Sequence, residues 1–118
     1  MEKGAEMIST LQLIAAIATI LTGLYSLIAP AKIDGFTGIK TIGQRGISEV
    51  RAIFGGTFIG LGIAPFLLSK SNVYPVLGVV YLAIAAVRGI SIVVDKSRER
   101  SNLISFAVEI AFGVLFLL

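Results

Sequence analysis

The residues best able to do chemistry are the few polar ones that interrupt long apolar stretches of the chain. These residues are Glu49, Arg51, Arg88, Ser91, Asp95 and Glu109. Guanidinium groups held by carboxylates can grip an anionic or carbonyl group, and a carboxylate inside a membrane can relay a proton. The chain has no histidine and no cysteine, which excludes His or Cys metal sites, thiol nucleophiles, Ser-His triads and disulfides. We therefore expect neither a metal ion nor a cofactor.

The elements that position these residues are predicted to be membrane-spanning helices. Of the 118 residues 56% are hydrophobic and 14% charged, whereas an ordinary soluble domain has about 25% charged residues. The uncharged stretch from residue 7 to residue 31 can cross a hydrocarbon core by itself, which takes about 20 apolar residues. It is too long for the apolar region of a signal peptide. The sequence predicts an all-α, antiparallel four-helix membrane bundle forming one domain over 1–118, with spans at 8–29, 49–69, 74–95 and 102–118.

The connection 30–48 is predicted to interrupt the helices and to lie at the cytoplasmic surface. Pro30 closes the first span, and four glycines in the connection disfavour a continuing helix. Its apolar residues recur at every third position, which suits a segment lying on the membrane surface. These residues are Ile33, Phe36, Ile39 and Ile42. Ser48 and Ser101 are expected as N-caps, and Asn72 with Pro75 is expected to begin the third span.

The distribution of basic residues predicts the orientation. Connections 30–48 and 96–101 carry Lys32, Lys40, Arg45, Lys96, Arg98 and Arg100, whereas the opposite side carries only Lys3 and Lys70. The positive-inside rule therefore makes both connections cytoplasmic and leaves both termini outside a bacterial inner (plasma) membrane. The net charge of +3 fits contact with anionic membrane lipids. The sequence shows no basic face with aromatic or polar side chains that could contact bases. We therefore expect no nucleic-acid partner.

Depth and spacing predict which charges meet. Arg88 and Glu109 each lie seven residues from the cytoplasmic end of their span, so both lie about 10 Å deep. We pair Arg88 with Glu109 and Arg51 with Asp95, and Glu49 can join either pair. The set of six would then form one ligand-binding or buried polar cluster in the cytoplasmic half.

Close helix packing is predicted from small residues in the second span. These residues are Gly55, Gly56, Gly60 and Gly62. Among them Gly56 and Gly60 have the spacing of a small-xxx-small pair, which lets two helices approach closely.

Three segments together carry a resemblance to a known family. EVRAIFGGTFIGLG (49–62), RGISIVVD (88–95) and the lone Glu109 in the last span resemble small bacterial four-helix membrane proteins catalogued as a domain of unknown function and distantly DoxX-like. The resemblance covers nearly the whole chain. It implies four spans, marks Glu49, Arg51, Arg88, Asp95 and Glu109 as the polar set, and implies no reaction. Lys96 departs from the pattern, since a glycine is expected after Asp95.

Several functions fit these residues. The first is a binding or accessory protein whose cluster holds the head group of a lipid or another hydrophobic small molecule. The second is a proton- or cation-coupled transporter working as a homodimer, with Glu109 as the deepest carboxylate. An enzyme is disfavoured, because the available repertoire of groups is narrow. In a fourth interpretation the charges only fix helix register. The expected partners are membrane lipids, a hydrophobic small molecule, and a second copy of the chain or a larger membrane complex.

Overall fold

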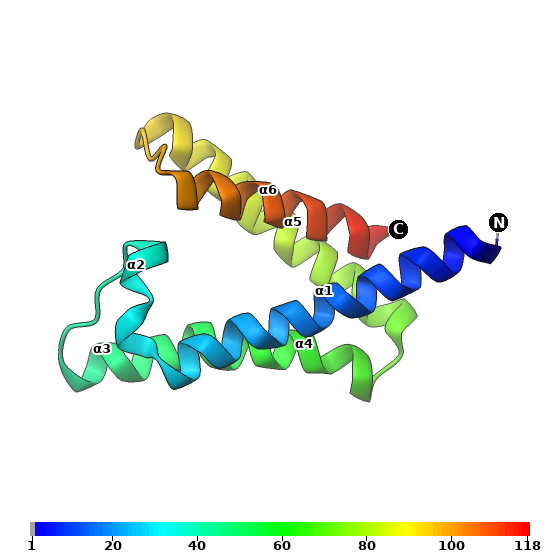
Figure 1. Ribbon diagram of the computed structural model, residues 1–118, viewed down its shortest axis with the longest axis horizontal. Helices are drawn as coiled ribbons and strands as arrows, with labels where there is room; N and C mark the ends of the chain where they lie inside the picture. The colour runs from blue at the N-terminus through cyan, green and yellow to red at the C-terminus, as the bar shows by residue number, and fades with distance from the viewer. Residues whose placement is uncertain (1) are drawn as a thin grey trace. The chain divides into compact units, whose positions relative to one another are not determined.

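The computed structural model describes residues 2–118, and within that range the chain is helical and has no β-strand. The long elements are α1 (Glu2–Ile28), α3 (Gly43–Glu49), the π-helix η2 (Val50–Gly56), α4 (Thr57–Leu67), α5 (Lys70–Val94) and α6 (Arg100–Leu117) (Figure 1). A 3-10 turn η1 (Pro30–Lys32) and the short α2 (Asp34–Thr37) lie in the first connection. Four helical stretches are long and apolar enough to cross a membrane: Glu2–Ile28, Gly43–Leu67, Lys70–Val94 and Arg100–Leu117. The all-α class is confirmed, and these stretches support a multi-pass membrane protein.

Three helix starts differ from the predicted ones, and none of them has a hydrogen bond from a capping side chain. The second stretch begins at Gly43, whose φ of +62° suits glycine, so Ser48 lies inside α3 and Ile42 is its N-cap. The third begins at Lys70, where the Ser69 carbonyl accepts from the backbone N–H groups of residues 72 and 73. The fourth begins at Arg100, so Ser101 lies inside α6 and is not its N-cap. The predicted N-caps at Ser48 and Ser101 are therefore wrong.

The chain divides into two compact units. The first unit joins the start of α1, up to Leu13, to the segment Leu68–Leu118, and the second unit is Ile14–Leu67. A single four-helix domain therefore stays a prediction. In each unit one pair of long helical elements packs through small residues.

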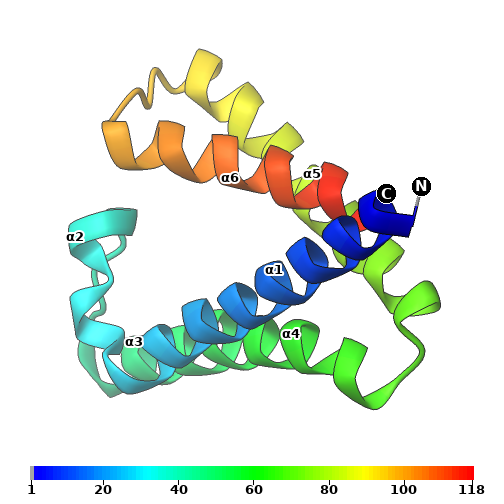
Figure 2. The ribbon, with the colours of Figure 1, turned by 45° about the vertical axis from the view of Figure 1, so that its right-hand side comes forward.

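In the second unit, α1 and the continuous α3–η2–α4 rod lie side by side (Figure 2). A Cβ atom on Gly23 would lie 2.7 Å from the Gly55 carbonyl oxygen, and one on Gly62 would lie 2.8 Å from the Ala16 carbonyl oxygen. Real Cβ atoms do not approach backbone oxygens so closely, so only glycine fits at these positions. Of the glycines predicted to pack, Gly55 lies opposite Gly23 and Gly62 lies opposite Ala16, so both take part in the contact with α1.

The predicted Gly56–Gly60 pair does not make this contact. A Cβ atom on either residue would meet nothing within 4 Å in the described part of the chain. The residues that do make the contact, Gly55 and Gly62, are seven positions apart, which is about two α-helical turns and puts them on one face. A packing role for Gly56 and Gly60 stays a prediction.

In the first unit, α5 and α6 pack against each other along their length. A Cβ atom on Gly78 would lie 3.0 Å from the Gly113 carbonyl oxygen, and both glycines are buried. An aromatic group fills the contact towards the C-terminal end of α6: Tyr74, Tyr81, Phe112 and Phe116. The start of α1 joins this unit through Gln12, whose Nε2 donates to the Leu115 carbonyl at 3.0 Å. That carbonyl lies in the last turn of α6 and also accepts from the Leu118 backbone N–H at 3.2 Å.

Large apolar side chains cover much of the outer surface. Ile28, Leu67 and Val94 are each at least 70% exposed, and many similar residues are exposed on every long helix. A monomeric protein in water rarely exposes such continuous apolar surface. Lipid acyl chains are the solvent that such a surface fits.

Candidate functional site

An ion pair between α5 and α6 joins two of the predicted site residues. Arg88 Nε donates to Glu109 Oε1 and Arg88 Nη2 donates to Glu109 Oε2, each at 2.7 Å. Arg88 Nη1 donates to Asn102 Oδ1, also at 2.7 Å. The Glu109 side chain is 11% exposed and that of Arg88 is 31% exposed. The predicted pairing of Arg88 with Glu109 is therefore present as a bidentate fork, the strongest arrangement of these two groups.

Helix geometry explains how two residues of α6 reach the same guanidinium group. Asn102 and Glu109 are seven residues apart, which is about two turns, so both lie on one face of the helix. Asn102 is a partner of Arg88 that the sequence analysis did not identify. Its spacing from Glu109 is the signal that could have found it.

The Arg88 contacts continue into the connection between α5 and α6. Asn102 Nδ2 donates to the Ser97 carbonyl at 3.0 Å and to Ser97 Oγ at 3.1 Å. Ser97 Oγ in turn donates to Glu99 Oε2 at 2.7 Å. This bond, together with the Glu99 backbone N–H, holds the pKa of the Glu99 carboxyl below its ordinary value. Because the folded pKa is lowered, Glu99 stabilises the fold at neutral pH, and this contribution is lost as pH falls through that pKa.

Ser91 and Asp95 contact each other one turn apart on α5. Ser91 Oγ donates to Asp95 Oδ2 at 2.6 Å, and Asp95 is exposed. The following residue, Lys96, has a φ of +55°, the left-handed conformation that favours glycine. That conformation explains why a glycine was expected at this position. The predicted partner of Asp95, Arg51, belongs to the other unit, so their pairing stays a prediction.

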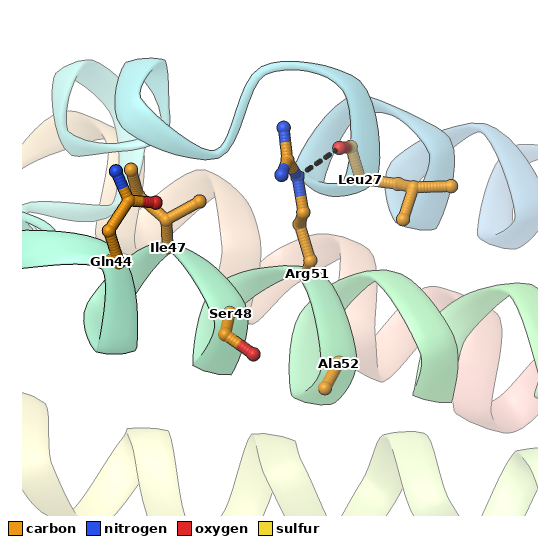
Figure 3. A pocket seen from close by; sticks show the side chains of 6 residues that line it. All are labelled: Leu27, Gln44, Ile47, Ser48, Arg51 and Ala52. Atoms are coloured by element: carbon orange, nitrogen blue, oxygen red, sulfur yellow. Dashed lines mark hydrogen bonds between the residues drawn. The ribbon is translucent and has the colours of Figure 1, made fainter.

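Arg51 stands at the start of η2 and contacts the end of α1 (Figure 3). Its Nε donates to the Leu27 carbonyl oxygen at 3.0 Å. This carbonyl lies in the last turn of α1, where a helix leaves acceptors unpaired and its dipole favours a positive charge. Within the second unit (Ile14–Leu67), the two Nη groups of Arg51 have no hydrogen-bond or ion-pair partner. Glu49, which was expected to join Arg88 or Arg51, pairs instead with Arg45 at 2.9 Å on the exposed side of α3.

A pocket of about 360 Å³ surrounds Arg51, and the residues that line it are Leu27, Gln44, Ile47, Ser48, Arg51 and Ala52. Gln44, Ile47 and Arg51 point from one side of α3 and η2 towards the end of α1 and the segment after it (Figure 3). The lining thus combines an amide, a hydroxyl and a guanidinium group with apolar side chains. Gln44 and Ile47 were not identified from the sequence, although they precede Arg51 by seven and four residues, a spacing that was a signal for one helical face.

The chain matches one family of proteins over most of its length. The family model described as Domain of unknown function (DUF4345) matches residues 8–118. The chain belongs to this family. The match includes all the polar residues named above and nearly the whole of the four apolar stretches. No curated protein and no solved structure matches the chain.

Within this DUF4345 chain, the six predicted residues fall into two sets. Glu49 and Arg51 lie in the second unit, whereas Arg88, Ser91, Asp95 and Glu109 lie in the first. One common site for all six stays a prediction. Residues 2–118 contain no group of three or more carboxylates that could hold a metal ion.

A second hollow, of about 480 Å³, follows α5 on the first unit. Its lining is made of aliphatic residues of α5 and of Phe106 from α6. A hollow of this kind can accept an acyl chain, but it offers no polar group to orient a ligand. The polar groups described above, Arg51 and the Arg88 pair, lie outside this apolar hollow.

Proposed function

We propose that this DUF4345 protein is an integral membrane protein that binds the anionic head group of a lipid or other amphiphile at Arg51. The observation that carries the proposal is the state of that guanidinium group. Its Nε is fixed on the Leu27 carbonyl, while both Nη groups adjoin a pocket and have no partner within the second unit. A planar guanidinium fits a phosphate or carboxylate through two parallel hydrogen bonds.

The rest of the pocket supports an amphiphilic ligand. Gln44 and Ser48 can hydrogen-bond to a head group, while Leu27, Ile47 and Ala52 offer apolar contacts. The pocket adjoins the last turn of α1, the place where a spanning helix meets the head-group layer. A ligand with a charged head and an apolar body fits both features.

The Arg88 pair supports a different role for the remaining cluster residues. Glu109 accepts two bonds from Arg88, so the two charges neutralise each other and neither calls for an external ion. Together with Asn102 the pair holds α5 to α6, as the structural interpretation of the charges expects.

We further propose the finer architecture that the composition favours. The four apolar stretches form an antiparallel bundle in a bacterial inner membrane, with connections 30–48 and 96–101 cytoplasmic and both termini outside. The six-to-two distribution of basic residues supports this orientation. A distant DoxX-like relationship is part of the same proposal.

The test of head-group binding compares two Arg→Gln variants on neighbouring turns. Arg51→Gln removes the pocket guanidinium, whereas Arg45→Gln removes an exposed one paired with Glu49. Native mass spectrometry in mild detergent measures retention of added phosphatidylglycerol, with phosphatidylcholine as the uncharged comparison. We expect wild type and Arg45→Gln to retain phosphatidylglycerol and Arg51→Gln to lose about tenfold in affinity, since hydrogen bonds to charged groups contribute about 1.5–3 kcal/mol.

Equal retention by Arg51→Gln and Arg45→Gln would refute the proposal. Arg51→Lys serves as a second variant, because it keeps the charge and loses the planar fork. Its retention should fall between those of wild type and Arg51→Gln. Circular dichroism of each variant checks that the helices remain formed.

A further inference from the structure

We infer that the connection between α1 and α3 is a membrane-surface element whose apolar side chains insert into the phospholipid head-group layer. The inference rests on side chains of this segment that point away from the protein. Phe36 is 53% exposed, Ile39 is 43% exposed and Ile42 is 85% exposed. Such exposure of large apolar residues is costly in water and favourable at the boundary between head groups and acyl chains.

The segment is ordered by its own hydrogen bonds. The Thr37 hydroxyl donates to the Ile33 carbonyl at 2.7 Å and accepts from the Ile39 backbone N–H at 3.0 Å. Gly38, with a φ of +75°, ends α2 and donates to the Asp34 carbonyl at 2.9 Å. Ile33 is buried and anchors the base of the segment. The exposed side chains are therefore carried on a defined backbone.

Both ends of the segment are tied to candidate membrane spans. α1 ends at Ile28 and the next spanning stretch begins at Gly43, so the short segment between them cannot move far from the surface. The Arg51–Leu27 hydrogen bond joins the two spans beside it. A segment held this way has the head-group layer as its immediate surroundings.

Charge also fits a phospholipid surface. Lys32 and Lys40 flank the apolar side chains, and both are exposed. Asp34 is the only acidic residue between them, so the segment carries two positive charges against one negative. Long lysine side chains can reach phosphate groups while neighbouring apolar residues lie deeper.

The absence of tryptophan from the chain permits a direct measurement. Phe36→Trp introduces a single fluorophore, and the protein is reconstituted in vesicles of phosphatidylcholine brominated at shallow, middle or deep acyl positions. Arg98→Trp is the matched control, because it lies in the other charged connection, which has no large apolar residue between Asp95 and Arg100. We expect shallow bromines to quench Phe36→Trp at least about twofold more strongly than Arg98→Trp, and deep bromines to quench it less than shallow ones.

Equal quenching of the two tryptophans, or emission of Phe36→Trp as red as in water with full access to iodide, would overturn the inference. Ile42→Trp repeats the measurement at the most exposed position, should Phe36→Trp fail to fold. Neither tryptophan position lines the Arg51 pocket, so this result and the phosphatidylglycerol measurement can fail independently.

Discussion

At the scale of residues, the fork between Arg88 and Glu109 differs from the ion pair between Arg45 and Glu49 in its exposure to solvent. The Arg88 and Glu109 side chains are mostly covered, whereas those of Arg45 and Glu49 are 87% and 51% exposed. A covered guanidinium that loses its carboxylate keeps the cost of desolvation without its partner. An exposed pair is screened and contributes little.

These differences give opposite expectations for two Glu→Gln variants. Glu109→Gln should lower the free energy of unfolding by about 1–3 kcal/mol, because one charged hydrogen-bond partner of Arg88 is lost. Glu49→Gln should change it by less than about 0.5 kcal/mol. Unfolding by sodium dodecyl sulfate in mixed micelles measures both. Similar losses in the two variants would show that the covered fork has no special role in stability.

The sequence identified the Arg88–Glu109 pair because depth along a helix depends only on residue number. It did not identify the partner of Arg51, since the Leu27 carbonyl is a backbone group and no side-chain pattern marks it. Asn102 was missed for a different reason: an amide near a helix start is typical of a turn or cap, and this role does not point to an arginine on another helix.

At the scale of elements, Gly55 and Gly62 lie on the side of the second spanning stretch that meets α1. Hydropathy found this stretch, because length and apolar content do not depend on which side packs. The sequence did not show which glycines meet α1, because the spacing of Gly55 with Gly62 and that of Gly56 with Gly60 each put a pair on one helical face. Only the packing of α1 distinguishes the two pairs.

The same geometry separates two Gly→Ala variants on α4. A methyl group on Gly62 would lie 2.5 Å from Ile20 Cγ1 and 2.8 Å from the Ala16 carbonyl oxygen, whereas one on Gly60 meets open space. Gly62→Ala should lower the free energy of unfolding by about 1–3 kcal/mol through overpacking. Gly60→Ala should leave it unchanged or raise it by up to about 1 kcal/mol, because alanine favours helix. Unfolding by sodium dodecyl sulfate in mixed micelles measures both variants. A loss of unfolding free energy in Gly60→Ala as large as that in Gly62→Ala would contradict the assigned contact.

At the scale of the whole molecule, the proposed orientation can be measured with single cysteines, since the chain has none. Thr41→Cys samples the first connection, and Gly4→Cys and Asn72→Cys sample the opposite side. None of these substitutions alters a charge that sets topology. In intact cells a membrane-impermeant maleimide should label residues 4 and 72 but not 41, and permeabilised cells should show all three labelled. Labelling of residue 41 alone in intact cells would reverse the orientation.

The fork between α5 and α6 also bears on how the protein is made. An arginine or an acidic residue at the centre of a lone helix adds about 2.5–3.5 kcal/mol to the free energy of insertion into a membrane. Arg88 and Glu109 belong to consecutive helices joined by a short connection, and they meet as a neutral pair. The two helices can therefore leave the insertion machinery as one hairpin, in which neither charge has to face lipid by itself.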